Sequence, residues 1–175
     1  YEDRKGLMGV ERFMRHYFLI AREVGDLTRS ICSILEERQK KSVPVISKAI
    51  TFLYAKNLDG FIVTSGRINI PGDSFFTEDP LNILRLFYFS SEQNLLIHPN
   101  AVKALRESLG LVNAKLRASR EANDLFLKIL LSKKNAESTL RAMNESGVLG
   151  RFISDFGKIV GLMQFNMYHH FTADE

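Results

Sequence analysis

A repeating apolar pattern near the start of the chain constrains the fold more than any other feature. Over residues 9–38, mostly apolar residues recur seven apart in three interleaved series: Val10, Tyr17, Val24 and Ile31; Phe13, Ile20, Leu27 and Ile34; Met14, Ala21, Thr28 and Leu35. The pattern predicts one long helix with a broad apolar stripe. Three apolar positions per heptad cover too wide an arc for a coiled-coil dimer, so we expect the stripe to pack into a globular core.

The opposite face of this helix is charged and is expected to face water. It carries, at helical spacing, Glu11, Arg15, Arg22 and Asp26. A basic, polar connector follows over residues 39–44, because Pro44 disfavours helix at the residue before it. Apolar spacing over residues 46–54 allows a short second helix.

The middle of the chain carries the strand signal. Residues 61–64 are β-branched and aromatic, Ser65 and Gly66 signal a turn, and residues 67–70 alternate polar and apolar side chains. This pattern predicts a small β-hairpin over residues 61–70.

The remaining residues give helix signals. Caps or first-turn residues predict helix starts at Asp79-Pro80, Pro99, Ser119 and Asn135. Gly110 predicts a break, and Gly147 predicts a helix end. The predicted fold class is therefore all-α, a helical bundle-like domain with one small β-hairpin near 61–70.

Composition narrows the functional classes. The net charge of +4 is spread along the sequence, so it gives little support for nucleic-acid binding. No run approaches the roughly 18 apolar residues that span a bilayer, so no membrane is expected. The single cysteine, Cys32, excludes an internal disulfide and fits a cytoplasmic location.

The sequence shows no catalytic constellation. It contains no nucleophile elbow, HExxH zinc helix or glycine-rich phosphate loop, so no catalytic residue is assigned. The only cluster of metal-capable side chains is His169-His170 with Asp174-Glu175. Adjacent residues point to different sides of a helix or strand, so the two histidines do not readily face one ion, and no metal ligand is assigned.

One segment, Glu78 to Arg85, has a more pointed interpretation. A helix start offers free N–H groups and a positive dipole end, and Asp79, Asn82 and Arg85 are spaced by three. Such a face can hydrogen-bond a nucleobase edge or a phosphate, so these three residues are candidate nucleotide-binding residues. The alternative is structural: Asp79 caps the helix, Arg85 pairs with an acid and Asn82 lies in water.

Several stretches together carry a family resemblance. They are residues 11–18, the hairpin with Gly66-Arg67-Ile68, residues 79–88, and residues 163–175 with Gln164-Phe165, Tyr168-His169 and Asp174-Glu175. They resemble the bacterial uridylyltransferase/uridylyl-removing enzymes, which modify the PII nitrogen-signalling protein. The likeness covers nearly the whole chain, apart from about residues 39–58.

The resemblance implies a longer enzyme with a nucleotidyltransferase domain, a helical domain, an HD-type metal phosphohydrolase domain and glutamine-sensing ACT domains. Residues 1–162 would be the helical linker domain, and residues 163–175 the truncated start of the HD domain. The transferase would join UMP from UTP to a tyrosine of PII with Mg²⁺ held outside this chain. The HD domain would remove UMP with its own divalent metal, so no cofactor is expected in this chain, and the chain alone is expected to be inactive.

In the family pattern the first metal-binding histidine follows the Asp174-Glu175 pair, so His169 and His170 are not its equivalents. Residues 78–85 also look like a neck motif of CCA-adding and poly(A) polymerases, where an aspartate and an arginine three residues later read the incoming base. Asp79 matches the acid, whereas Asn82 replaces the arginine. Asparagine offers a donor and an acceptor and can therefore pair with uracil.

Two other functions remain open from the sequence. The first is an RNA-binding module like the neck and body of tRNA nucleotidyltransferases, although acidic residues are interspersed with the basic ones here. The second is a helical adaptor that binds a protein partner through an exposed apolar groove, which the first helix could supply.

Overall fold

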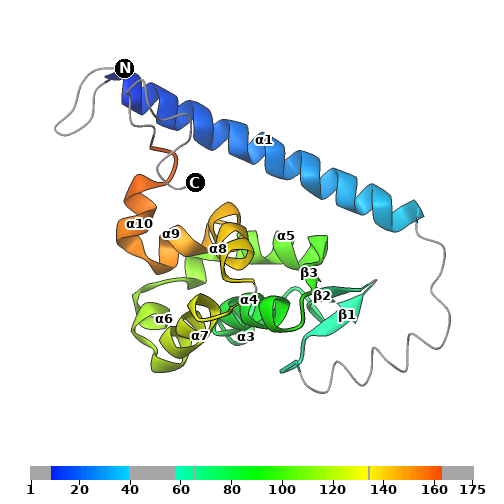
Figure 1. The fold of residues 1–175 in the computed structure, drawn as a ribbon. Coiled ribbons are helices and arrows are strands. Elements are labelled where there is room, and N and C mark those ends of the chain that lie inside the picture. The colour runs from blue at the N-terminus through cyan, green and yellow to red at the C-terminus, as the bar shows by residue number, and fades with distance from the viewer. Residues whose placement is uncertain (1–8, 40–57, 65, 134, 163–175) are drawn as a thin grey trace.

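The long N-terminal helix is present and lies along one side of the other elements (Figure 1). In the computed structural model, residues 9–39, 58–64, 66–133 and 135–162 are described. The first helix, α1, runs over Gly9–Gln39, as the apolar repeat predicts. The expected connector over residues 39–44 lies almost entirely, and the short helix over residues 46–54 wholly, outside the described residues.

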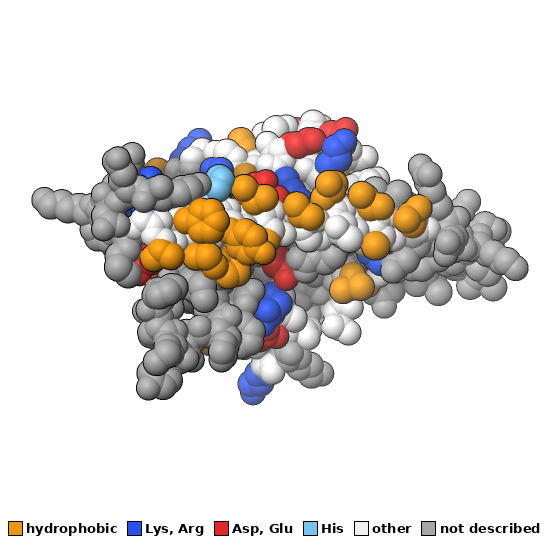
Figure 2. All heavy atoms as spheres, turned by 90° about the horizontal axis from the view of Figure 1, so that it is seen from above, with side chains coloured by type: hydrophobic (Ala, Val, Ile, Leu, Met, Phe, Trp, Pro, Cys, Tyr) orange, Lys and Arg blue, Asp and Glu red, His pale blue; other side chains and the backbone are white. Residues whose placement is uncertain are grey.

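The orientation of α1 is the reverse of the expected one. The large apolar side chains that form what we call the α1 stripe are 42–60% exposed: Val10, Phe13, Tyr17, Ile20, Val24, Leu27, Ile31 and Leu35. Figure 2 shows hydrophobic side chains gathered along α1 on the face seen from above. Glu11, Arg15 and Arg22 on the opposite face are half-buried, whereas the side chain of Asp26 lies outside the described set. The stripe therefore does not pack into the core that the described residues form, contrary to the expectation.

The predicted hairpin is confirmed. Strand β1 (Ile62–Thr64) pairs antiparallel with β2 (Arg67–Asn69), with Val63 opposite Ile68. A third strand, β3 (Leu96–Ile97), was not predicted, and it pairs parallel with β2. Two residues are too few to show the alternation that marks a strand in sequence.

Helices make up most of the rest of the fold, which confirms the predominantly helical class. They are α3 (Phe75–Glu78), α4 (Asn82–Glu92), α5 (Pro99–Glu107), the 3₁₀ turn η1 (Leu109–Leu111), α6 (Ala114–Ala118), α7 (Arg120–Leu130), α8 (Ala136–Glu145), α9 (Val148–Phe152) and α10 (Ser154–Ile159). Among the described residues, no helix has an apolar stretch long enough to traverse a bilayer.

The helix ends follow from local chemistry. Asn113 Oδ1 accepts hydrogen bonds from the N–H groups of Lys115 and Leu116 at 2.9 and 3.2 Å, which caps α6. Ser119 caps α7 as predicted, with its Oγ 3.4 Å from the nitrogen of Ala122. The predicted break near Gly110 is confirmed, because α5 ends at Glu107 and the chain passes through η1 before α6.

Two predicted boundaries differ in detail. Asn135 occupies the position before α8, but its side chain does not cap the helix. Its Nδ2 donates instead to the carbonyl oxygen of Ser91 at 2.9 Å, which ties α8 to the end of α4. Gly147 ends α8 as predicted with φ of +82°, a left-handed conformation that glycine adopts without a Cβ clash.

The core lies around α4, which packs against α7 and α8 (Figure 1). The largest fully buried side chains come from the hairpin, α3, α4, α5, α7, α8 and α9, and include Phe61, Phe76, Phe87, Leu105, Ile129, Met143 and Val148. Each large apolar side chain removed from water contributes about 1.5–3 kcal/mol. Among the described residues this core runs from Leu58 to Phe152 and contains no side chain of α1.

A close backbone approach joins the last two helices. A Cβ placed on Gly157 of α10 would lie 2.2 Å from the carbonyl oxygen of Gly150 in α9. Only a residue without a side chain fits at this crossing.

Candidate functional site

The structure brings the three candidate nucleotide-binding residues together at the start of α4. Arg85 Nη1 donates to Asp79 Oδ2 at 2.7 Å and to Asn82 Oδ1 at 2.9 Å. Asp79 Oδ1 accepts the backbone N–H of Leu81 at 3.0 Å in the turn before α4. The helix itself begins at Asn82 without a side-chain cap, later than the predicted start at Asp79-Pro80. The spacing by three therefore places all three side chains in one hydrogen-bonded group, which we call the α4 clamp.

A fourth residue belongs to the α4 clamp and was missed at the sequence level. The Asp59 carboxylate lies 3.6 Å from Arg85 Nε. Asp59 is in the turn before the hairpin, with φ of 46°. Local sequence patterns do not tell which distant helix a turn side chain meets, so this contact could not be predicted.

The amide of Asn82 is engaged at both ends within the protein. Its Oδ1 accepts from Arg85, and its Nδ2 donates to the carbonyl oxygen of Phe75 in α3 at 3.2 Å. Asn82 is only 5% exposed, which differs from the expectation that it lies in water. In this arrangement the amide edge faces α3 and Arg85 and is not presented to a nucleobase.

The charge of the α4 clamp further limits what it can bind. Two carboxylates, Asp59 and Asp79, surround one guanidinium, so the group carries a net negative charge that repels a phosphate. The side chains of Asp59, Asp79 and Arg85 are 60%, 48% and 26% exposed, so the outward part of the clamp is formed mainly by the two carboxylates. Both oxygens of the Asp79 carboxylate already accept a hydrogen bond within the protein, from the Leu81 N–H and from Arg85. Nucleotide binding by Asp79, Asn82 and Arg85 stays a prediction.

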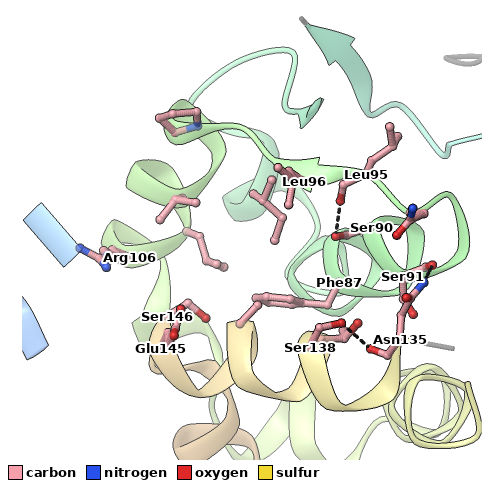
Figure 3. Close-up of a pocket in the computed structure, with 17 residues that line it drawn as sticks. Phe87, Ser90, Ser91, Leu95, Leu96, Arg106, Asn135, Ser138, Glu145 and Ser146 are labelled. Carbon is pink, nitrogen blue, oxygen red and sulfur yellow. Dashed lines mark hydrogen bonds between the residues drawn. The ribbon is translucent and has the colours of Figure 1, made fainter. Parts of the chain in front are cut away.

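A separate pocket of about 280 Å³ lies between α4, β3, α5 and α8 (Figure 3). Phe87 and Leu105 contribute apolar surface, and Ser90, Asn135 and Ser138 lie at its polar side. The hydroxyls are already used as donors: Ser90 Oγ bonds to the carbonyl of Leu95 at 2.6 Å, and Ser138 Oγ to that of Asn135 at 3.1 Å. These two hydroxyls are therefore not available as donors to a ligand, whereas Arg106 and Glu145 add one side chain of each charge to the lining.

No metal centre forms among the described residues, which contain no group of three or more His, Cys, Asp or Glu side chains with suitable geometry. The motif His169-His170 with Asp174-Glu175 lies outside the described residues, so the structure does not test it. His98, the residue before Pro99, is buried and accepts the N–H of Asn100 through Nδ1 at 3.1 Å. The His98 side chain therefore caps the N-terminus of α5.

The fold and the site define a helical domain in which the α4 clamp connects α4 to α3 and to the turn before the hairpin. The chain belongs to the family described as the uridylyltransferase GlnD third domain, whose model matches residues 61–152. The matched region begins at the hairpin and ends in α9, so α1 precedes it.

Two curated relatives align with the entire chain. The bifunctional uridylyltransferase/uridylyl-removing enzyme of Bradyrhizobium sp. strain ORS 278 is 48% identical over 182 aligned positions, with 100% of this chain and 19% of the relative covered. The protein of the same name from Bradyrhizobium diazoefficiens is 50% identical, with 100% and 20% covered. The chain therefore spans about a fifth of the length of these relatives. No solved structure matches the chain.

Proposed function

We propose that this chain is a helical segment of a bifunctional enzyme that transfers UMP from UTP to a tyrosine of PII and later removes it by hydrolysis. The observation that carries the proposal is the identity of 48–50% over the whole chain with two uridylyltransferase/uridylyl-removing enzymes. In this proposal Mg²⁺ serves the transferase domain, a second divalent metal serves an HD domain, and glutamine regulates both activities. The proposed setting is the cytoplasm.

We assign residues 1–162 to a helical linker between the nucleotidyltransferase and HD domains, and residues 163–175 to the start of the HD domain. The arrangement of the α4 clamp supports a structural role for the matched region. Arg85 joins the turn before the hairpin to the start of α4, and Asn82 joins α4 to α3. The segment would then hold the two active sites at a fixed separation without supplying a complete site to either.

The test is a uridylylation assay. The 175-residue chain is incubated with UTP, Mg²⁺ and PII, and the mass of PII is measured. We expect no mass increase of one UMP per tyrosine with the chain alone, and we expect that increase with the full-length enzyme. Uridylylated PII produced by the chain alone would overturn the structural role, and its absence with the full-length enzyme would overturn the proposed activity.

Nucleotide binding by the α4 clamp is tested separately in the full-length enzyme. The hypothesis predicts that Asp79→Ala and Asn82→Ala raise the KM for UTP and reduce the preference for UTP over CTP. The matched control is Asp124→Ala, because Asp124 is an exposed acid that pairs with Arg120, 3.9 Å away on the same helix. Unchanged KM and preference in the first two variants would leave the clamp with its structural role alone.

The RNA-binding alternative has weaker support, because both relatives are named for uridylyl transfer and removal. It predicts tRNA binding that weakens steeply between two salt concentrations. Titration of the chain with tRNA at low and physiological salt measures this directly.

A further inference from the structure

The α1 stripe is a long, half-exposed apolar surface that contributes no side chain to the core formed by the described residues. From Val10 to Leu35 it extends over roughly 38 Å at 1.5 Å per residue. With each side chain about half exposed, the stripe presents roughly 700 Å² of apolar surface, taking roughly 150–200 Å² for a large side chain. That exceeds the roughly 300–600 Å² of the largest patch on a typical monomer.

Residues 58–64, 66–133 and 135–162 do not form an apolar surface that covers the stripe. The charged face of α1 is the face turned toward the body, with Glu11, Arg15 and Arg22 half-buried. Leu19, which lies on that face and outside the stripe, is beside Gly161. The described core is complete from Leu58 to Phe152 without α1. The stripe is therefore turned away from the only core that the described residues form.

The family match indicates what covers the stripe. The matched model is that of a third domain and begins at residue 61, so α1 lies on the side of the preceding domains. Both relatives align through α1 and have about four-fifths of their length outside the aligned region. A preceding domain in the same polypeptide is thus held next to α1 at high effective concentration.

The side chains of the stripe indicate the shape and charge of the surface that would pack against it. Phe13 and Tyr17 lie toward the start of α1, whereas Val24, Leu27 and Ile31 continue it with aliphatic groups. The stripe contains no charged residue. Its partner is therefore an uncharged groove, wider where it receives the rings and narrower toward the end of α1. The apolar repeat adds a third position beside the usual two, which favours a groove between two helices over a single helix from a second copy.

We propose that the α1 stripe docks into an apolar groove of the domain that precedes it in the longer polypeptide. The proposal rests on the proposed function only in placing the chain within a longer enzyme. Its readout is thiol accessibility, which is independent of uridylyl transfer. Failure of the activity assay and failure of this proposal are therefore distinguishable.

The experiment uses the full-length enzyme and single cysteine substitutions, with alkylation by N-ethylmaleimide followed at each site by mass spectrometry. Leu27→Cys probes the stripe, where the native side chain is 60% exposed in this chain, and Val24→Cys serves as a second probe if the first variant fails to fold. Leu131→Cys is the exposed control at the end of α7, with 77% exposure of the native residue. Val148→Cys is the buried control, because Val148 is fully buried in the core.

We expect Leu27→Cys to react at least tenfold more slowly than Leu131→Cys in the full-length enzyme. Deletion of everything before residue 1 should bring the two rates together while Val148→Cys stays protected. Equal rates in the full-length enzyme would overturn the proposal. If Leu27→Cys stays protected from alkylation after the deletion, the proposal is also overturned. If its protection disappears on hundredfold dilution of the intact enzyme, the partner is a second copy and the proposal is again overturned.

Discussion

The close crossing of α9 and α10 gives a sharp test of the packing. Replacing Gly157 by alanine adds one methyl group that would lie 2.2 Å from the carbonyl oxygen of Gly150 and 3.0 Å from its carbonyl carbon. Ordinary contacts for a Cβ atom begin at 3.4 Å. Both obstructing atoms belong to the backbone, so no side-chain rotation relieves the clash.

The expected loss of folding free energy in Gly157→Ala follows from this geometry. The two helices must separate by about 1 Å, which opens the packing behind them, and overpacking of this kind costs roughly 1–3 kcal/mol. One residue, Ile153, connects α9 to α10, and the Gly157 N–H bonds to the Ile153 carbonyl at 3.0 Å. That short link limits how far α10 can move away. We therefore expect a cost near the upper end of the range.

The assays are urea unfolding and thermal melting of the 175-residue chain, both followed by circular dichroism. At roughly 2–4 °C per kcal/mol for a chain of this size, a loss of about 2–3 kcal/mol should lower the melting temperature by about 4–12 °C. The matched control is Gly110→Ala, since a Cβ there meets nothing within 4 Å. That variant should be neutral or gain up to about 1 kcal/mol by restricting the unfolded chain. A Gly157→Ala variant within about 0.5 kcal/mol of the wild type would refute the reasoning.

Three further predictions concern single side chains. Asn113→Ala should cost about 1 kcal/mol in urea unfolding, because two amides at the start of α6 lose their acceptor. Asn82→Ala should cost roughly 1–3 kcal/mol in the same assay, because it removes a buried acceptor of Arg85. The hydrogen bond and ion pair with Lys158 lower the pKa of the exposed Asp155 carboxyl. The stabilisation of the fold by this pair is therefore present above the ordinary carboxyl pKa and is lost as the pH falls through the lowered pKa. Lys158→Met should return the Asp155 pKa toward its ordinary value in an NMR titration.

Much of the fold follows from local residue chemistry. Pro99, Ser119 and Gly147 mark the helix boundaries where the sequence predicts them, and the hairpin forms around its turn. These features depend on a few neighbouring residues and their backbone preferences, which sequence patterns record directly. The same holds for Asn82 and Arg85, because residues three apart are neighbours on α4, and Asp79 joins them from the turn before the helix.

The features that were missed depend on distant contacts. Asp59 reaches Arg85 across the whole hairpin, and Asn82 is buried because the unpredicted helix α3 offers the Phe75 carbonyl. The direction of the α1 stripe is a third case. An amphipathic pattern predicts that one face of the helix packs against an apolar surface, but it does not predict whether that surface lies in the same stretch of chain.

The parallel pairing of β2 with β3 makes the hairpin and α4 a single cooperative unit. Arg67 lies opposite Leu96, and the N–H of His98 bonds to the Ile68 carbonyl at 2.8 Å, so the intervening chain must fold before these bonds can form. Amide hydrogen exchange at Ile68 and His98 should then require the same opening event as exchange in the middle of α4. Proteolytic cleavage in the hairpin would therefore destabilise α4 in the core as well as the edge of the sheet.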